Sequence, residues 1–446
     1  MSEKLVLVAG LGKTGYSIAH YLKRKNQPFI AFDTRSEVLG LDEFKTTFPG
    51  VDLFLHDLPQ TIYPTLTAVI MSPGISLDEP FLQCAREQAI PIYGDIECFA
   101  QEVQKPVIAI TGTNGKSTVT TLVGEMVKKA GFKVAVAGNI GDPVLDRLND
   151  DANYDFWVLE LSSFQLDLTH SLAPKAAALL NVTPDHLDRH HTMAAYVAAK
   201  QRVYQGANAL IYNRQDPHTL PQKGAFDARV VSYGLDEGAH GNWGILEKDR
   251  VLYLAQGQEC VLPVEQLRIK GKHNWQNALA ACALAGAAGV AREAMVAVLT
   301  EFPGLAHRCQ WVRTLDSVEW INDSKGTNVG ATESAIAGIG GFMQGKIVLI
   351  AGGLGKGADF AGLRQPVLDY VRLLVLIGQD ADKIASDLTD TVPIVRASTI
   401  EEAVGQARVY AKPGDVVLLS PACASFDMFR DFNHRGEVFT QLVSAL

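Results

Sequence analysis

Residues 111–118 read Thr-Gly-Thr-Asn-Gly-Lys-Ser-Thr, and this stretch constrains the fold more than any other. The apolar run Val107–Ile110 before it predicts a buried strand, and Val119–Val123 after it begins a helical pattern. A strand, a glycine-rich turn and a helix start form a cradle for phosphate, because backbone N–H groups and the positive helix end face the anion. In such a cradle Lys116 reaches the outer phosphates, and Ser117 supplies a hydroxyl for Mg²⁺.

The spacing of this turn differs from that of a strict Walker A loop. That loop requires a glycine five residues before Gly115, where this chain has Ile110. The shorter pattern still indicates phosphate binding between a strand and a helix, and the alternative is an ordinary corner without a ligand. The predicted phosphate contacts are Gly112, Thr113, Asn114, Gly115, Lys116, Ser117 and Thr118.

Length, composition and charge narrow the class of protein. A chain of 446 residues is too long for one core, and 47% hydrophobic with 20% charged residues is a globular balance. A net charge of −9 without a basic run argues against nucleic acid as a partner. The six cysteines are scattered, the N-terminus leads directly into an apolar strand, and no apolar stretch reaches membrane-spanning length. We therefore expect a cytoplasmic protein without membrane insertion.

Short apolar runs alternate with helical patterns along the whole chain, which predicts α/β domains with mostly parallel sheets. We expect three domains, at residues 1–95, 96–303 and 304–446. The first and third are expected to be Rossmann-like, and the central one is expected to be of the P-loop ATPase type. Residues 225–265 suggest a small β subregion, and His273–Ala288 an Ala-rich helix. The expected strands are Leu5–Ala9, Phe29–Phe32, Ala68–Met71, Val134–Ala137, Phe156–Leu159, Ala176–Asn181, Ile347–Ala351, Leu373–Ile377 and Val416–Leu419.

A second glycine-rich turn, Gly10–Gly15, follows the first strand, and Asp33 ends the next one. This arrangement indicates dinucleotide binding and makes a nicotinamide oxidoreductase an alternative function, although the turn suits any nucleotide diphosphate. Arg35 is either a ligand contact or a solvated loop arginine. Ser72 follows a strand at the edge where a parallel sheet binds ligands.

Acidic, histidine and lysine side chains follow the strands of the central domain. Glu160 is placed either to bind Mg²⁺ or to cap a helix. The segment 185–191 lacks the spacing of a soft-metal site, so we select His186 as a residue beside Mg²⁺ and phosphate and expect His190 and His191 at the surface. Spacing alone makes Lys200 an exposed helical lysine.

Further polar segments lie in the last 175 residues or so. Asn274 and Asn277 share a helix face on which both can meet a base, although Asn274 is alternatively a helix cap. His307-Arg308 and the segment 322–328 suit ribose and phosphate. The glycine-rich loop 352–360 and the segment 421–432 also follow strands, at sheet edges.

Taken together, these segments resemble the Mur ligase family, the ATP-dependent amide ligases of peptidoglycan precursor synthesis and folate polyglutamylation. The resemblance runs from Lys4 to the C-terminus. Segments 323–328 and 425–427, with the turn at 10–15, agree with the branch of the family that adds D-glutamate. Gly326 stands where alanine is usual and Leu354 where aspartate is expected. The segments that carry the family resemblance are 111–118, 160–165, 181–188, Lys200, 273–277 and 307–308.

This resemblance implies a reaction and its participants. D-Glutamate would be joined to UDP-N-acetylmuramoyl-L-alanine at the expense of ATP, through an acyl phosphate and a tetrahedral intermediate. The three domains would bind the UDP substrate, ATP and the amino acid in that order, and a monomer is expected. Two Mg²⁺ sites are implied, with Lys200 modified by CO₂ to a carbamate.

Residue roles are implied in the same way. Lys116, His186 and Lys200 would be catalytic. Ser117, Glu160, His186 and Lys200 would bind metal. The ATP contacts beyond the phosphate loop would be Asn274, Asn277, Arg308, Asp323 and Lys325. The UDP substrate would meet Thr14, Asp33, Thr34, Arg35, Ser72, Asn139 and Ser162, and D-glutamate would meet Thr327, Lys356, Ser425 and Phe432.

Three alternatives stay open at this point. A nicotinamide dehydrogenase would leave residues 111–118 and 323–328 without a function. A nucleotide switch without enzymatic activity would use the phosphate loop alone. A ligase of the same family would act on a different amino acid.

Overall fold

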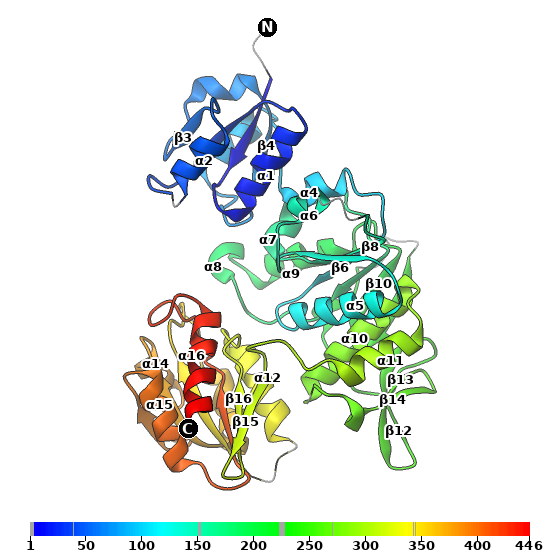
Figure 1. Cartoon of the computed structure of the whole chain (residues 1–446), viewed down its shortest axis with the longest axis vertical. Helices are drawn as coiled ribbons and strands as arrows, with labels where there is room; N and C mark the ends of the chain where they lie inside the picture. The colour runs from blue at the N-terminus through cyan, green and yellow to red at the C-terminus, as the bar shows by residue number, and fades with distance from the viewer. Residues whose placement is uncertain are drawn as a thin grey trace.

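The structure is a computed structural model, which describes residues 4–38, 40–149, 153–222, 228–269, 271–341, 343 and 345–446. Within these ranges the strands form three sheets of five, nine and six strands, which Figure 1 shows as three bodies. The expected α/β class is confirmed. The domain boundaries after residues 95 and 303 stay predictions. Residues 1–3 of the expected first domain and 225–227 of the expected β subregion lie outside the described residues.

The first sheet is parallel throughout and has the strand order β3-β2-β1-β4-β5. This order reverses direction between β1 and β4, so a ligand crevice is expected at their carboxyl ends. The strands of the sheet are β1 (Leu5–Ala9), β2 (Phe29–Asp33), β3 (Leu53–Leu55), β4 (Leu66–Met71) and β5 (Ile92–Tyr93). The helices around it are α1 (Lys13–Arg24), α2 (Leu41–Thr47), the 3₁₀ helix η1 (Gln60–Thr65), α3 (Pro80–Glu87) and α4 (Asp95–Ala100).

The second sheet has the order β14-β13-β12-β11-β10-β9-β6-β8-β7. Its parallel part runs from β7 to β12, and the antiparallel strands β12–β14 extend it, so the expected β subregion belongs to this sheet. Its strands are β6 (Val107–Thr111), β7 (Val134–Gly138), β8 (Phe156–Glu160), β9 (Ala176–Leu179), β10 (Ala209–Asn213), β11 (Arg229–Tyr233), β12 (Trp243–Lys248), β13 (Val251–Gln256) and β14 (Glu259–Pro263). Its helices are α5 (Lys116–Lys129), α6 (Val144–Leu148), α7 (Ser163–Asp167), α8 (Leu187–His190), α9 (Met193–Gln201), η2 (Arg202–Tyr204), η3 (Pro217–Thr219), η4 (Val264–Gln266), α10 (Lys272–Ala288) and α11 (Arg292–Glu301).

The third sheet has the order β15-β16-β20-β17-β18-β19, with β15 antiparallel to β16 and the other pairs parallel. Its strands are β15 (Gln310–Leu315), β16 (Val318–Asn322), β17 (Ile347–Gly352), β18 (Val371–Ile377), β19 (Ile394–Arg396) and β20 (Val416–Leu419). Its helices are α12 (Val329–Gly340), η5 (Ala361–Leu363), α13 (Arg364–Tyr370), α14 (Ala381–Asp387), α15 (Ile400–Tyr410) and α16 (Phe432–Ala445).

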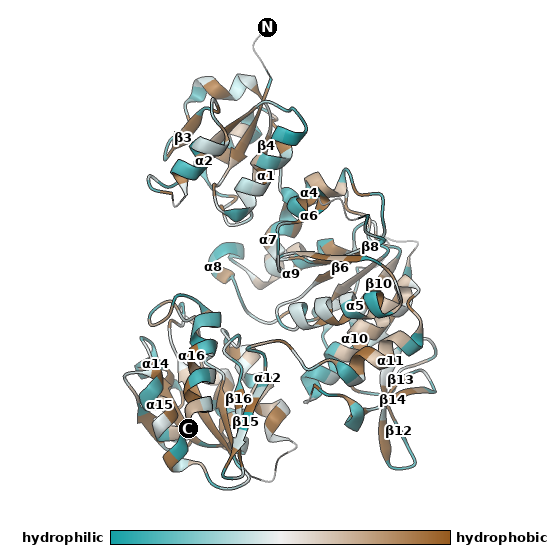
Figure 2. Cartoon of the chain, in the orientation of Figure 1, coloured by the Kyte–Doolittle hydropathy of each residue, from teal (hydrophilic) through white to brown (hydrophobic). Residues whose placement is uncertain are grey.

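The central strands of each sheet are apolar and buried, as parallel strands covered by helices on both faces must be. Figure 2 shows brown central strands and helices that mix teal, white and brown along their length. The Ala-rich α10 packs with α5 in one core cluster, because small side chains let the helices approach closely. All six cysteines are free thiols, and in the described part of the chain no helix combines the length and apolarity needed to cross a membrane.

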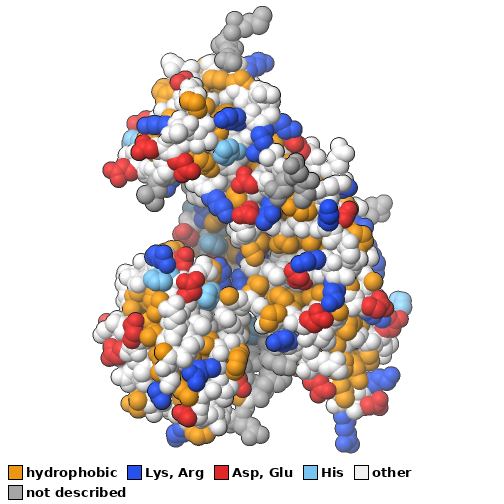
Figure 3. Space-filling view, viewed as in Figure 1, with side chains coloured by type: hydrophobic (Ala, Val, Ile, Leu, Met, Phe, Trp, Pro, Cys, Tyr) orange, Lys and Arg blue, Asp and Glu red, His pale blue; other side chains and the backbone are white. Residues whose placement is uncertain are grey.

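The first body is joined to the second by contacts between α1 and the region of α6. Ser17 Oγ donates to Asp146 Oδ1 at 2.7 Å, and an Arg24 Nη2 group donates to the carbonyl of Leu145 at 3.0 Å. Figure 3 shows a hollow between the first and third bodies, with basic, acidic and histidine side chains around it. Because parallel sheets bind ligands at the carboxyl ends of their strands, the functional site is expected at those ends of the central strands.

Candidate active site

The phosphate loop joins β6 to α5 and depends on two glycines. Gly115 caps the helix with φ +81°, and a Cβ there would lie 2.5 Å from Asn277 Oδ1. Gly112 also has positive φ, and a Cβ there would lie 3.0 Å from the side chain of Leu180. The left-handed Gly115 lets α5 begin at Lys116, three residues before the apolar pattern suggests.

The ammonium of Lys116 lies within the loop. Its Nζ donates to the carbonyls of Gly112 and Thr113 at 2.9 and 2.8 Å. Burial lowers the pKa of Lys116, while the charge of Glu160 acts in the opposite direction. The loop thus holds a cation beside a row of backbone N–H groups, which is the arrangement that binds phosphate.

Asn181, which follows β9, holds the outer part of the loop, and the choice of candidate residues from the sequence missed it. Its Oδ1 accepts from the N–H of Asn114 at 2.8 Å, and its Nδ2 donates to the carbonyl of Asn114 at 3.0 Å. β9 is the neighbour of β6 in the sheet, so the two carboxyl ends meet. The order of strands, which the sequence does not state, would have indicated this contact.

Glu160 ends β8 on the other side of β6, with its side chain only 2% exposed. Its Oε1 accepts from Asn139 Nδ2 at 2.9 Å, whereas no partner for its Oε2 exists among the described residues. A buried carboxylate oxygen without a donor is costly unless a cation meets it. Glu160 therefore fits a metal ligand, and Asn139 orients it.

Lys200 lies on α9 and is 2% exposed, so the exposed helical lysine that spacing alone predicts is wrong. Its Nζ donates to the carbonyl of Gly112 at 2.9 Å and lies 4.6 Å from the centre of the Tyr196 ring. Burial, followed by the nearby charge of Lys116, lowers the pKa of Lys200 well below its usual value. Among the described residues, the hydrogen bond of the buried Lys200 amine goes to a backbone carbonyl and not to a carboxylate.

His186 precedes α8 with φ +53°, a left-handed conformation that is uncommon outside glycine. Its side chain is 46% exposed, and its Nε2 lies 3.7 Å from Asp185 Oδ2. Burial lowers the pKa of His186, and the charge of Asp185 opposes this effect. Within the described residues, no group of three His, Cys, Asp or Glu side chains is arranged to hold a metal, so Mg²⁺ here would need oxygens from phosphate and water as well.

His190, which we expected at the surface, is buried. Its side chain is 6% exposed, and its Nε2 lies 2.9 Å from Ser163 Oγ. The turn of α8 directs it inward against α7, which a sequence of three nearby histidines does not disclose. His191 is 69% exposed, as expected.

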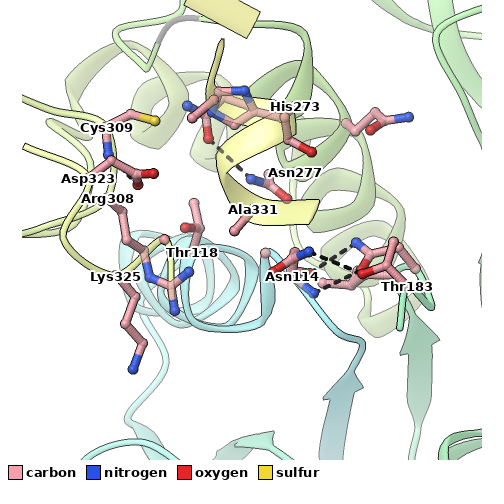
Figure 4. A pocket seen from close by; sticks show the side chains of 18 of the residues that line it. Asn114, Thr118, Thr183, His273, Asn277, Arg308, Cys309, Asp323, Lys325 and Ala331 are labelled. Atoms are coloured by element: carbon pink, nitrogen blue, oxygen red, sulfur yellow. Dashed lines mark hydrogen bonds between the residues drawn. The ribbon is translucent and has the colours of Figure 1, made fainter. Parts of the chain in front are cut away.

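A cavity of about 200 Å³ lies between the phosphate loop, α10 and the third body (Figure 4). Asn274 and Asn277 of α10 line it, and Asn277 Nδ2 donates to Asn274 Oδ1 at 3.1 Å. The residue that caps α10 is Gly271, so the alternative role of Asn274 as the cap is wrong. Figure 4 shows Arg308, Cys309, Asp323 and Lys325 entering from the other side.

Charged groups of the third body reach the phosphate loop. An Arg308 Nη2 group donates to Ser117 Oγ at 2.8 Å. Burial raises the pKa of Asp323 to about 6, and burial together with Arg308 lowers the pKa of Lys325 to about 8. Lys325 Nζ lies 3.6 Å from the centre of the Phe432 ring. The cavity therefore combines amides for a base with cations for phosphate.

Thr327, Lys356 and Ser425 lie on loops that follow β16, β17 and β20, three neighbouring strands, and Phe432 is the first residue of α16, after the β20 loop. Backbone hydrogen bonds tie these loops: Leu354 and Ala424 exchange two, at 2.9 and 3.0 Å, and Ala422 N donates to Gly326 O at 2.8 Å. The contact made by Leu354 uses backbone atoms, so a leucine in place of aspartate leaves it intact.

Gly326 lies in a crowded place. A Cβ there would be 2.6 Å from Asp323 Oδ2 and 2.7 Å from Ser420 Oγ, two atoms that are hydrogen-bonded to each other at 2.7 Å. Glycine at this position therefore leaves room for the bond.

At the edge of the first sheet, the structure brings together Asp33, Arg35 and Ser72. Arg35 donates from Nε to Asp33 Oδ1 and from Nη2 to Oδ2, both at 2.8 Å, so its guanidinium is paired rather than only solvated. Burial opposes ionisation of Asp33, but the hydrogen bonds of Arg35 and Leu11 outweigh it and lower the pKa of Asp33. Ser72 Oγ donates to the carbonyl of Gly10 at 3.0 Å.

The remaining residues predicted for this substrate are half-buried or already engaged. Thr14 and Thr34 are half-buried at the same edge. Ser162 caps α7 in a reciprocal arrangement with Gln165, so its hydroxyl has a structural partner.

The three bodies each match a family model. The Mur ligase MurD-like N-terminal domain matches residues 4–94, the Mur ligase middle domain residues 110–285, and the Mur ligase glutamate ligase domain residues 307–423. The chain belongs to the Mur ligase family.

Full-length similarity is to proteins named UDP-N-acetylmuramoylalanine–D-glutamate ligase. The protein of that name from Legionella pneumophila (strain Lens) is 64% identical over 447 residues, covering 100% of both chains. The protein of that name from Hahella chejuensis is 48% identical over 444 residues, covering 100% of this chain and 99% of the other.

Solved structures share the fold. MurF from Acinetobacter baumannii has a TM-score of 0.62 at 18% identity, covering 99% of this chain and 91% of the other. UDP-N-acetylmuramate–alanine ligase from Thermotoga maritima has a TM-score of 0.60 at 17% identity, covering 99% of each chain.

Proposed function

We propose that this chain joins D-glutamate to the alanyl carboxylate of UDP-N-acetylmuramoyl-L-alanine in peptidoglycan precursor synthesis, with conversion of ATP to ADP and phosphate. The observation that carries this function is the 64% identity, over the full length of both chains, to a protein named for that ligation. The site agrees with it, since a phosphate loop, a base-sized cavity and two further sheet edges are present on one chain.

The chemistry explains why three binding regions are needed. A carboxylate is a poor acyl donor, so transfer of the γ-phosphoryl group first makes an acyl phosphate. The amine of D-glutamate then attacks the acyl carbon, and phosphate leaves from the tetrahedral intermediate. Positioning of three reactants and compensation of their crowded negative charge are what the protein supplies.

ATP is assigned to the cavity and the phosphate loop. The cavity is smaller than the roughly 300–1,000 Å³ of pockets for drug-sized ligands, so it suits the base, with the phosphates outside it along the loop. Asn274 and Asn277 are proposed to meet adenine. Lys116 and the backbone of residues 112–118 are proposed to hold the phosphates. Contacts with ribose and phosphate are assigned to Arg308, Asp323 and Lys325.

Mg²⁺ is assigned to the free oxygen of Glu160 and the hydroxyl of Ser117. A second Mg²⁺ is assigned to His186 and Lys200. When bound, the cations compensate the phosphate charge. Asn139 contributes by holding Glu160 Oε1 through its 2.9 Å hydrogen bond, while Oε2 has no partner among the described residues.

Lys200 is proposed to carry a carbamate. Its neutral amine would add to CO₂ and lose a proton, which converts a cation into a carboxylate suited to Mg²⁺. The lowered pKa of Lys200 supports this step, because only the neutral amine reacts with CO₂.

A variant tests this role of Lys200. Lys200→Ala should lose activity and regain part of it with added short carboxylic acids, and ¹³CO₂ should give a carbamate NMR signal only in the unmodified sequence. Lys128→Ala, at an exposed position of α5, is the matched control. A correctly folded Lys200→Ala that is not rescued, together with no carbamate signal, would refute the modification.

The substrates are assigned to the other two sheet edges. The UDP part is assigned to Thr14, Asp33, Thr34, Arg35 and Ser72, with Asn139 and Ser162 beyond them. D-Glutamate is assigned to Thr327, Lys356, Ser425 and Phe432. Because UDP-sugar peptides and ATP are cytoplasmic metabolites, the cytoplasm is the proposed location, and a monomer is the proposed state.

One assay tests the function against its alternatives. Phosphate release from ATP should require both UDP-N-acetylmuramoyl-L-alanine and an amino acid, and D-glutamate should be preferred across a panel of amino acids. Release without either substrate would favour a nucleotide switch, and preference for another amino acid would assign a different ligation. Turnover of NADH without ATP would indicate a dehydrogenase.

A further inference from the structure

The segment 185–191 carries His186 on a short turn that stands away from its sheet. In Figure 1, α8 projects from the second body on the side that faces the first and third bodies. Both residues that flank α8 have positive φ, +53° at His186 and +61° at His191. Positive φ is uncommon and strained for non-glycine residues, so this turn depends on contacts with neighbouring structure to keep its conformation.

His190 is the buried residue of this turn. The four residues 186–188 and 191 are exposed and Arg189 is half-buried, whereas the His190 side chain is 6% exposed. Its Nε2 is hydrogen-bonded to Ser163 Oγ at 2.9 Å. Its ring stacks on Phe164 with 5.4 Å between centroids and 21° between planes, and lies 5.1 Å from the Tyr196 ring.

The position of His190 is transmitted to His186 by one direct contact and through the Phe164 ring, which both histidines meet. The N–H of His190 donates to the carbonyl of His186 at 3.0 Å, which closes the single turn of α8. The Phe164 ring on which His190 stacks also meets the His186 ring edge-on, at 5.1 Å. A displacement of His190 therefore moves the backbone and one packing surface of His186 together.

Ser163, the hydrogen-bond partner of His190, connects this histidine to the end of β8, where Glu160 lies. It begins α7, three residues after Glu160, and is 2% exposed. His190 meets its neighbours through one side-chain hydrogen bond, to Ser163 Oγ, and through the faces of its ring, which lie against Phe164 and Tyr196. The Asp167 carboxylate, 4.0 Å from His190 Nδ1, lies too far for a direct hydrogen bond.

We propose that His190 is a positioning residue of the ligase reaction, which with Ser163 fixes the imidazole of His186 relative to Glu160 and Lys200. This inference rests on the proposed function, because it assigns His190 the task of placing a cation ligand. Its two contributions are separable by substitution. Phenylalanine keeps the stacking but leaves the Ser163 hydroxyl without its partner, whereas glutamine retains a hydrogen-bonding group but loses the stacking.

Four variants test the proposal: His190→Phe, His190→Gln, Ser163→Ala and the double variant His190→Phe/Ser163→Ala. His191→Gln, at the exposed neighbouring position, is the matched control. Binding of Mn²⁺ as a probe for Mg²⁺ is measured by electron paramagnetic resonance in the presence of a non-hydrolysable ATP analogue. Steady-state rates and thermal midpoints are measured in parallel.

We expect His190→Phe to weaken Mn²⁺ binding or lower kcat by about 10- to 100-fold, the range found when partners of metal ligands are removed. The KM for D-glutamate should not change, and His190→Gln should recover part of the loss. Ser163→Ala should resemble His190→Phe, and the double variant should be no worse than either, because both remove the same interaction.

Two results would overturn the proposal. One is that His190→Phe binds Mn²⁺ and turns over like His191→Gln. The other is that it loses thermal stability with unchanged Mn²⁺ binding and unchanged kcat, which would make His190 structural only. Failure of the proposed function itself is distinguishable, since the unmodified chain would then form no ADP with UDP-N-acetylmuramoyl-L-alanine and D-glutamate, whatever its Mn²⁺ binding.

Discussion

Asp95, the first residue of α4, is a buried carboxyl that should weaken the fold at neutral pH. It is 3% exposed, and no partner for its Oδ1 exists among the described residues. Burial raises its pKa from 3.8 to about 6, although the backbone N–H groups of Ile96 and of Asp95 itself favour the ionised form. At about 1.4 kcal/mol per pKa unit, ionisation in the folded state costs roughly 3 kcal/mol above pH 6.

The sign of the pH dependence follows from the raised pKa. Below pH 3.8 the carboxyl is protonated in both states, so the penalty is absent. As the pH rises from 3.8 to about 6, only the unfolded state ionises, and the free energy of unfolding falls; above about 6 the penalty is complete. Asn at position 95 does not titrate. The free energy of unfolding of Asp95→Asn, relative to that of the unmodified chain, should therefore rise by about 2 kcal/mol between pH 4.5 and 7.5.

Urea unfolding at several pH values measures this difference. Trp157 packs against Phe99 of α4 with ring centroids 4.8 Å apart, so intrinsic fluorescence reports on unfolding near Asp95. If the difference in the free energy of unfolding between Asp95→Asn and the unmodified chain is the same at pH 4.5 and 7.5, the reasoning is refuted. It is also refuted if the unmodified chain becomes the more stable of the two as the pH rises.

Glu97, two residues further on, provides a control of opposite sign. Burial opposes its ionisation, but hydrogen bonds from Ser171 and His170 outweigh this effect and lower its pKa. Its carboxylate therefore contributes stability that is present above the unfolded pKa and is lost as the pH falls through the folded pKa. Glu97→Gln should be less stable than the unmodified chain at pH 7.5, and the deficit should shrink on acidification.

Three further predictions concern single contacts. Arg372→Met should lower the free energy of unfolding in urea by about 3 kcal/mol, because it leaves the 1% exposed carboxylate of Asp415 without its guanidinium partner; a change below about 0.5 kcal/mol would contradict this. Gly326→Ala should destabilise the chain by about 1–3 kcal/mol in calorimetry and raise the KM for ATP, because its Cβ would lie 2.6 Å from Asp323 Oδ2; an unchanged thermal midpoint and KM would count against it. Arg189→Gln should raise the KM for UDP-N-acetylmuramoyl-L-alanine about tenfold and leave that for ATP unchanged, since its guanidinium donates to two carbonyls of the first body; equal changes in both constants would argue against a substrate-specific role.

The sheets were the predictable part of this fold. Apolar runs such as Val107–Ile110 and Val416–Leu419 are buried on both faces, so their composition alone marks them as central strands. Their ends were less predictable. β9 stops at Leu179 rather than Asn181, because Asn181 turns to hold the phosphate loop, a partner fixed by strand order and not by local sequence.

Burial of polar side chains was the unpredictable part of the site. Lys200 and His190 have ordinary helical neighbours in the sequence, and only the stacking of α9 and α8 on other elements encloses them. Likewise, the pairing of Asn139 with Glu160 joins the residue that follows β7 to the last residue of the adjacent strand β8, a neighbourhood set by topology. Glycine-rich turns were easier to recognise, because their backbone requirement is local.

The backbone ties among the loops after β16, β17 and β20 have a consequence for how this chain relates to others of its family. Arg435, 1% exposed, adds to them by donating to the carbonyls of Ser324 and Cys423 at 2.8 and 3.1 Å. The loops assigned to the amino acid are thus fastened to one another inside one body. Exchange of the third body between relatives should therefore transfer the amino-acid specificity of the donor protein, and the ATP site of the second body should keep its properties.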